Sequence, residues 1–129
     1  FNTRAFDING EYDDNKKLIG ITTDKHQEAK DCGLDYTCTP EAWVKAWKLT
    51  GWNTARVEVS GKYPQINTFI NGLKVAEFNG ETCNAANYDK GKIHGMLGSA
   101  GSVAVQVHGG TGWPNGSKCR WKNIRIKPM

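Results

Sequence analysis

The side chains with the clearest chemical potential are Gln106 and His108, near the end of the valine-rich segment 102–108. Strand alternation would place three valines on one face and Gln106 and His108 on the other. An imidazole transfers protons near neutral pH, and an amide hydrogen-bonds a polar substrate. The two side chains are therefore either ordinary solvent-facing positions or part of a site.

Glu58 is the carboxylate best placed to join such a site. In the segment 54–60, Val57 and Val59 are predicted to face the core, and Arg56 and Glu58 to face outward. General acid–base chemistry requires two carboxyl groups that converge on a cleft. The sequence does not identify the partner of Glu58. Trp113, in the loop after His108, would offer a flat surface for sugar stacking.

These residues require an all-β scaffold to position them. Fifteen glycines and many short alternating runs favour an antiparallel β-sandwich in a single domain, residues 1–129. The predicted strands are residues 3–9, 17–23, 54–60, 65–70, 73–78, 92–97, 102–108 and 118–127. In the last strand, a bulge around Lys122 and Asn123 is needed to bring Trp121 and Ile124 to the same face.

The strongest local signal is the dipeptide Asn71-Gly72, which predicts a two-residue β-hairpin turn of type I′. Such a turn pairs Ile70 with Leu73, Thr68 with Val75, and Ile66 with Glu77. Residues 24–53 instead form a decorated loop with a short helix. Its entry is Thr39-Pro40, a capping hydroxyl followed by proline, and Trp43 and Trp47 share one helix side.

Several function classes receive little support. The net charge of +4 is mild and the basic residues are scattered, which argues against nucleic-acid binding. No apolar run is long enough to predict a membrane span. No serine lies in a nucleophile motif, and the glycine-rich segment 98–102 lacks the lysine of a phosphate-binding loop. The acidic stretch 7–14 is better interpreted as a solvated turn than as a calcium loop.

Four cysteines, without C-x-x-C spacing, favour two disulfides over a zinc site. Of the three pairings, Cys32–Cys38 and Cys83–Cys119 are the preferred one. Disulfides imply a secreted, periplasmic or otherwise extracellular protein. The absence of an initiator methionine and of a signal pattern is expected for a mature secreted chain or a processed fragment.

Four segments in order resemble one known family. They are "GWNTARVEVSG", "INTFINGLKV", "VAVQVHG" and "CRWKNIRIKPM", spanning residues 51–129. The chain resembles the 3-keto-disaccharide hydrolase-like domain family of glycosyl hydrolase-like proteins. The resemblance implies a concanavalin-like jelly roll, a saccharide substrate, a secreted or periplasmic location and a divalent, calcium-like metal ion.

The resemblance also suggests roles for individual residues. Gln106 and His108 match the family's Q-x-H and become catalytic candidates with Glu58. Trp113, Arg56 and Arg4 become substrate-binding candidates. Asn53, Asn71-Gly72 and Asn123 match positions that look structural. Arg4 would be the survivor of a family strand that residues 1–50 otherwise do not display.

Departures from the family pattern leave three functions open. Thr68 and Val107 stand where the family often has a histidine and an acid. The chain could be a saccharide-cleaving enzyme, a non-catalytic carbohydrate-binding module, or a structural subunit of an extracellular assembly. Because family members extend further at the N-terminus, we expect the C-terminal part of a longer domain. We expect either a processed fragment or a sheet completed by another chain or a homo-oligomer.

Overall fold

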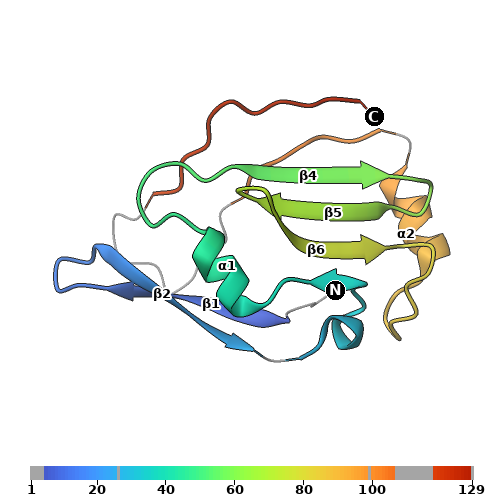
Figure 1. Ribbon diagram of the computed structural model, residues 1–129. Helices are drawn as coiled ribbons and strands as arrows, with labels where there is room; N and C mark the ends of the chain where they lie inside the picture. The colour runs from blue at the N-terminus through green and yellow to red at the C-terminus, as the bar shows by residue number, and fades with distance from the viewer. Residues whose placement is uncertain (1–4, 26, 99, 107–117, 129) are drawn as a thin grey trace.

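The computed structural model describes residues 5–25, 27–98, 100–106 and 118–128 and has an all-β architecture with two short α-helices (Figure 1). Strands β1 and β2 form a two-stranded antiparallel sheet. A four-stranded antiparallel sheet has the order β3-β6-β5-β4. The all-β prediction is confirmed, and the arrangement is consistent with a sandwich. The described strands form two separate sheets and do not close into one jelly roll.

Strand β1 (Phe6–Tyr12) and strand β2 (Leu18–Lys25) form the N-terminal hairpin, close to the predicted strands 3–9 and 17–23. Asp13 organises the turn between them. Its Oδ1 accepts hydrogen bonds from the backbone N–H groups of Asn15 at 3.0 Å and Lys17 at 2.8 Å. The acidic stretch 7–14 therefore serves the hairpin, with the carboxylate of Asp13 replacing backbone acceptors in the turn.

Strands β5 (Gln65–Ile70) and β6 (Leu73–Asn79) form the predicted hairpin. Asn71 and Gly72 have φ angles of 50° and 88°, as a type I′ turn requires. Ile70 pairs with Leu73 as predicted, and a β-bulge follows the next pair, Phe69 with Lys74. The predicted pairs of Thr68 with Val75 and Ile66 with Glu77 are wrong, because the bulge inserts one extra residue into β6.

The bulge changes the face on which Glu77 lies. Thr68 pairs with Ala76, and Asn67 pairs with Glu77. Directly paired residues project from the same face of a sheet. Glu77 therefore joins Asn67 on the polar face instead of joining Ile66 on the apolar face.

Two further strands complete the four-stranded sheet. Strand β4 (Ala55–Ser60) pairs with β5, and the two-residue strand β3 (Tyr36–Thr37), which the sequence did not predict, pairs with β6. Val57 and Val59 share one face of β4, as predicted, but they are 60% and 55% exposed. The prediction that they face a core is wrong, because within the described residues nothing covers that side of β4 sufficiently to bury them.

Helix α1 (Pro40–Ala46) confirms the predicted helix and its cap. The Thr39 hydroxyl accepts a hydrogen bond from the Ala42 backbone N–H, and Pro40 begins the first turn. The ring of Trp43 is buried and stacks on Trp47 with centroids 5.0 Å apart. Helix α1 contacts both β2 and β6, so it joins the two sheets (Figure 1).

The predicted strand 92–97 is wrong, because this segment lies in helix α2 (Lys90–Leu97). Asp89 precedes the helix, and its Oδ1 accepts a hydrogen bond from the Lys92 backbone N–H at 2.9 Å. This N-cap satisfies one of the free donors of the first turn. The cap therefore starts a helix despite Gly91 and Gly95.

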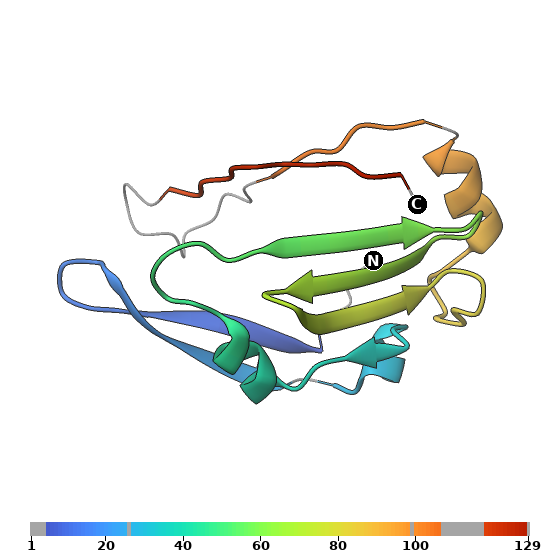
Figure 2. The ribbon, with the colours of Figure 1, turned by 45° about the horizontal axis from the view of Figure 1, so that its top comes forward.

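The prediction of two C-terminal strands is also wrong for the described residues. Residues 101–106 and 118–128 have no strand assignment, and residues 107 and 108 lie outside the described part. Residues 118–128 run beside β4, on the side away from β5, in both views (Figures 1 and 2). Without regular backbone pairing, Val103 and Ile126 are left 69% and 75% exposed. Asn123, at the predicted bulge, has a positive φ of 55°.

All four cysteine thiols are free in this structure, so the predicted disulfides stay a prediction. Cys32 ends the short 3-10 helix η1 (Ala29–Cys32), and Cys38 follows β3. Strand β3 lies between these two buried residues in the sequence. The Cys83 thiol points instead to the Gly33 carbonyl, and Cys119 is exposed.

Candidate functional site: a polar row across the four-stranded sheet

Three polar side chains form one row across the polar face of the four-stranded sheet. Glu58 on β4 pairs with Asn67 on β5, and Asn67 pairs with Glu77 on β6. We call Glu58, Asn67 and Glu77 the polar row. Tyr36 on β3 pairs with Glu77 and extends the row by one position. The sheet thus brings together residues that are far apart in sequence.

Glu77 is held by two neighbours on this face. Its Oε2 forms an ion pair with the Lys74 ammonium, and its Oε1 accepts a hydrogen bond from Gln65 Nε2 at 3.4 Å. The hydrogen bond from Lys74 lowers the pKa of the Glu77 carboxyl, against a smaller opposing effect of desolvation. Glu77 is therefore ionised and oriented, as a hydrogen-bond acceptor or base must be.

Glu58 has a matching arrangement on the other side of the row. Its Oε1 forms an ion pair with Arg56, two residues away on the same strand. The Arg56 guanidinium also lies over the Phe69 ring, 3.9 Å from the centroid. A cation over an aromatic face is stabilised by the ring quadrupole, so Phe69 positions Arg56 and Arg56 positions Glu58.

Asn67, between the two carboxylates, has an enclosed Oδ1 atom with no hydrogen-bond partner among the described residues. An unsatisfied buried amide oxygen costs about 1–3 kcal/mol. Such atoms are uncommon in native structures and require an explanation. An acceptor that the described residues leave without a partner is suited to a ligand that brings its own hydroxyl or N–H donor.

The spacing within the polar row is suited to a small ligand. Neighbouring strands are about 4.8 Å apart, so the backbones under Glu58 and Glu77 are separated by roughly 10 Å. The two side chains can lean toward each other over Asn67. Two carboxylates with an amide between them can accept and donate protons on either side of one sugar ring.

The predicted site residues are only partly brought together. Arg56 and Glu58 lie on the polar face as predicted and form an ion pair. Gln106 is exposed, and within the described residues no hydrogen bond, ion pair or ring contact joins it to Glu58. His108, Trp113 and Arg4 lie outside the described residues, so their predicted roles stay predictions.

Sequence reasoning missed Asn67 and Glu77, the other two members of the polar row. Regular alternation in β6 assigns Glu77 to the apolar face, and only the bulge moves it. The available signal was that Gln65 and Asn67 alternate in β5 and lie on the face that Glu58 occupies in β4. A polar residue at each of two adjacent positions would have indicated a polar sheet face there.

The asparagines that were predicted to be structural have the expected contacts. Asn71 Nδ2 donates to the Ala46 carbonyl and to Asn53 Oδ1, both at 2.7 Å, and Asn71 Oδ1 accepts from the Thr54 N–H at 2.9 Å. Asn53 is bonded in both directions to the Lys48 backbone. These amides fix the loop between α1 and β4, so the structural interpretation is confirmed for Asn53 and Asn71.

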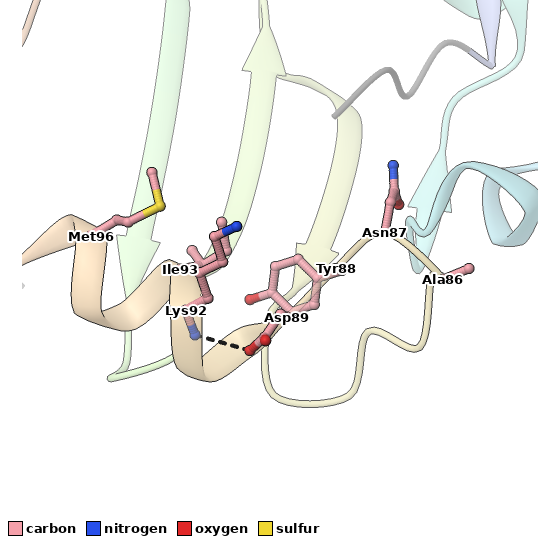
Figure 3. A pocket seen from close by; sticks show the side chains of 7 residues that line it. All are labelled: Ala86, Asn87, Tyr88, Asp89, Lys92, Ile93 and Met96. Atoms are coloured by element: carbon pink, nitrogen blue, oxygen red, sulfur yellow. Dashed lines mark hydrogen bonds between the residues drawn. The ribbon is translucent and has the colours of Figure 1, made fainter.

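A separate hollow of about 450 Å³ lies between the loop after β6 and helix α2 (Figure 3). Tyr88 packs edge-on against Phe78 with centroids 5.3 Å apart, and Asp89 is used as the cap of α2. The lining residues are Ala86, Asn87, Tyr88, Asp89, Lys92, Ile93 and Met96. Its single carboxylate already has a structural role, so we assign no chemistry to this hollow.

The described residues do not fit a metal ion. Within residues 5–25, 27–98, 100–106 and 118–128, no three histidine, cysteine, aspartate or glutamate side chains approach closely enough to hold one. Both carboxylates of the polar row are also engaged by cations. We therefore derive no step through a metal.

The comparisons with known proteins agree with the resemblance in the C-terminal motifs. A family described as the 3-keto-alpha-glucoside-1,2-lyase-like domain matches residues 4–127. The match thus extends beyond residues 51–129 and includes the N-terminal hairpin and the whole four-stranded sheet. No curated protein and no solved structure matches the chain. Among the described residues, no helix is long and apolar enough to cross a membrane.

Proposed function

The chain belongs to the 3-keto-alpha-glucoside-1,2-lyase-like domain family, and we propose that the polar row is its saccharide-processing site. Membership supports a role that involves saccharides. The observation that carries the finer proposal is the alignment of Glu58, Asn67 and Glu77 on one sheet face.

The proposed reaction is cleavage of the glycosidic bond of a 3-keto-glucoside. A ketone at C3 acidifies the hydrogen on C2, and the group on C1 lies one bond further along. Removal of the C2 proton and departure of the C1 oxygen break the C1–O bond and form the C1–C2 double bond. Addition of water to that double bond would complete a net hydrolysis.

Each member of the polar row has a separate role in this proposal. Glu77, which Lys74 keeps ionised, accepts the C2 proton. Glu58, on the far side of the row, holds the water molecule that protonates the departing C1 oxygen. The resulting hydroxide adds to C1, and Glu77 returns its proton to C2. Asn67 Oδ1 accepts a hydrogen bond from a sugar hydroxyl and so holds the ring between the two carboxyl groups.

Activity on a 3-keto-α-glucoside with a chromogenic leaving group tests this proposal. We expect Glu77→Gln and Glu58→Gln each to lower kcat by about 10²–10⁴-fold, the usual contribution of a general acid or base. Glu81→Gln is the matched control. It makes the same chemical change and removes an ion pair with Lys90, but on the turn after β6, where we expect full activity.

Two results would count against the catalytic proposal. Wild-type-like rates in both row variants would remove the polar row from the chemistry. A large loss of kcat in Gln106→Ala, without any loss of kcat in Glu77→Gln, would place the active site in the C-terminal segment instead.

The alternative is a non-catalytic saccharide-binding module that uses the same face. It is favoured by the ion pairs of Arg56 with Glu58 and of Lys74 with Glu77, since these hold both carboxylates in fixed, charge-compensated positions. This alternative predicts saccharide binding by calorimetry, weakened in Asn67→Ala, without release of the leaving group.

The location, the metal and the partners belong to the same proposal. We propose a secreted or periplasmic protein, with any divalent ion held through residues outside the described part. A second copy could complete the open sheet. Such a copy would cover Val57 and Val59, which are 60% and 55% exposed on β4. Native mass spectrometry and metal analysis of the purified protein test these points, and a metal-free monomer would contradict them.

A further inference from the structure

Two cysteines, Cys32 and Cys83, lie at the end of the four-stranded sheet where β3 begins and β6 ends, whereas the Cys38 N–H donates to the Val75 carbonyl further along β6. Cys32 ends η1, Cys38 follows β3, and Cys83 lies in the turn after β6. The Cys83 Sγ is 3.6 Å from the carbonyl oxygen of Gly33, the residue covalently attached to Cys32. Consecutive Cα atoms are about 3.8 Å apart, so this contact brings Cys83 into the neighbourhood of Cys32.

Backbone hydrogen bonds hold the two segments at this approach. The Asp35 N–H donates to the Glu77 carbonyl at 2.9 Å, and the Cys83 N–H donates to the Asn79 carbonyl at 2.9 Å. The first bond joins β3 to β6, and the second fixes the turn that carries Cys83. The proximity of Cys83 to Gly33 is therefore a property of the fold and not of one side-chain rotamer.

We propose that Cys32 and Cys83 form a thiol pair that oxidises to a disulfide between η1 and the turn after β6. A disulfide requires Cα atoms about 4.4–6.8 Å apart. Gly33 permits the closing movement, because it has no side chain and already has a positive φ of 72°. This inference does not depend on the saccharide proposal.

The exposure of the two thiols sets the order of the steps. Cys83 is half-buried and reacts first with a small disulfide such as oxidised glutathione. The Cys83 thiolate forms a mixed disulfide and releases one glutathione thiolate, which takes up the Cys83 proton. Cys32 then attacks the Cys83 sulfur and releases the second glutathione. The protein pair loses two electrons, and the small disulfide gains them.

Burial makes the second step the slow one. Desolvation, followed by the nearby Asp31 carboxylate, raises the pKa of the Cys32 thiol. Because the thiolate is the nucleophile, closure of the disulfide should accelerate as the pH rises from 7 to 9. The disulfide would link the segment that precedes β3 to the turn that follows β6, the strand that carries Glu77.

Peptide mapping of the oxidised wild-type protein tests the pairing. Cleavage before aspartate combined with cleavage after lysine and arginine places Cys32, Cys38 and Cys83 in three separate peptides, 31–34, 35–45 and 75–88, so each possible link gives a different pair of peptides. We expect oxidised glutathione to yield a Cys32–Cys83 peptide, a free Cys38 thiol and a glutathionylated Cys119. We also expect the melting temperature to rise by roughly 10 °C, reversibly with dithiothreitol.

Two variants provide the controls. Cys119→Ser removes the exposed thiol and should leave the Cys32–Cys83 link unchanged, whereas Cys83→Ser should leave Cys32 as a free thiol. A Cys83–Cys119, Cys38–Cys83 or Cys32–Cys38 peptide, or only a mixed disulfide at Cys83, would overturn the proposal. Because mapping uses the unmodified chain, a folding defect in either variant does not affect this decision.

Discussion

Two asparagines on the β5–β6 hairpin, Asn67 and Asn71, have opposite hydrogen-bonding environments. Asn71, in the turn, uses its amide fully, with bonds to Ala46, Asn53 and Thr54. Asn67, in the middle of β5, has an enclosed oxygen without a partner among the described residues. The same side chain therefore stabilises the fold at one position and costs stability at the other.

This difference separates folding residues from candidate ligand-binding residues without reference to any relative. A satisfied amide that links α1, the following loop and the hairpin is explained by the fold. An unsatisfied amide between two carboxylates is not explained by the fold, because an apolar side chain of the same size would be less costly there. The polar row is thus the region in which a side chain, that of Asn67, lowers the stability of the fold.

The largest expected effect on stability concerns Asn71. Asn71→Ala removes three side-chain hydrogen bonds and places alanine at a φ of 50°. We expect the free energy of unfolding to fall by about 2–4 kcal/mol in urea denaturation. A loss no larger than that of Asn67→Ala would contradict the contrast between the two asparagines.

Asn67→Leu should have a smaller effect of the opposite sign. Leucine has a similar shape and removes the unsatisfied oxygen, so we expect the unfolding free energy to rise by about 1 kcal/mol. Saccharide affinity should weaken about tenfold in calorimetry, because the acceptor for a sugar hydroxyl is lost. A variant that loses stability would show that the amide serves the fold.

The smallest effect concerns the titration of Glu77. Lys74→Met removes the hydrogen bond that lowers the Glu77 pKa, so this pKa should rise toward its ordinary value of about 4.5. A depressed folded-state pKa stabilises the fold above the unfolded value, and this stabilisation is lost as the pH falls through the folded value. NMR titration of the carboxyl carbon measures the shift. Lys90→Met, beside Glu81, is the control that should leave Glu77 unchanged.

The sequence predicted the elements that rest on local chemistry. Asn71-Gly72 encodes its turn because both positions adopt positive φ, and Thr39-Pro40 encodes a helix start through a hydroxyl cap. The segment 92–97 was predicted wrongly as a strand, because the Asp89 carboxylate caps the first turn and starts a helix there. Both successes and this error concern contacts within a few residues.

The polar row could be predicted only in part, since it depends on pairing between strands. Glu58 and Arg56 follow from simple alternation in β4, which has no irregularity. The position of Glu77 follows from a bulge that no residue type in β6 predicts. The two-residue strand β3, which brings Tyr36 beside Glu77, is too short for any periodicity to be detected.

The bulge beside Val75 has a consequence for anyone who redesigns this sheet. Strand β6 contains two alternation phases, one before the bulge and one after it, so Lys74 and Glu77 share a face although they are three residues apart. Deletion of Val75 would remove the extra residue and merge the two phases, while Thr68 stays paired with Ala76 and Asn67 with Glu77, so Glu77, Phe78 and Asn79 would keep their faces. A substitution at Val75 would instead keep the extra residue, so only a change in chain length can make this strand regular without turning a side chain over.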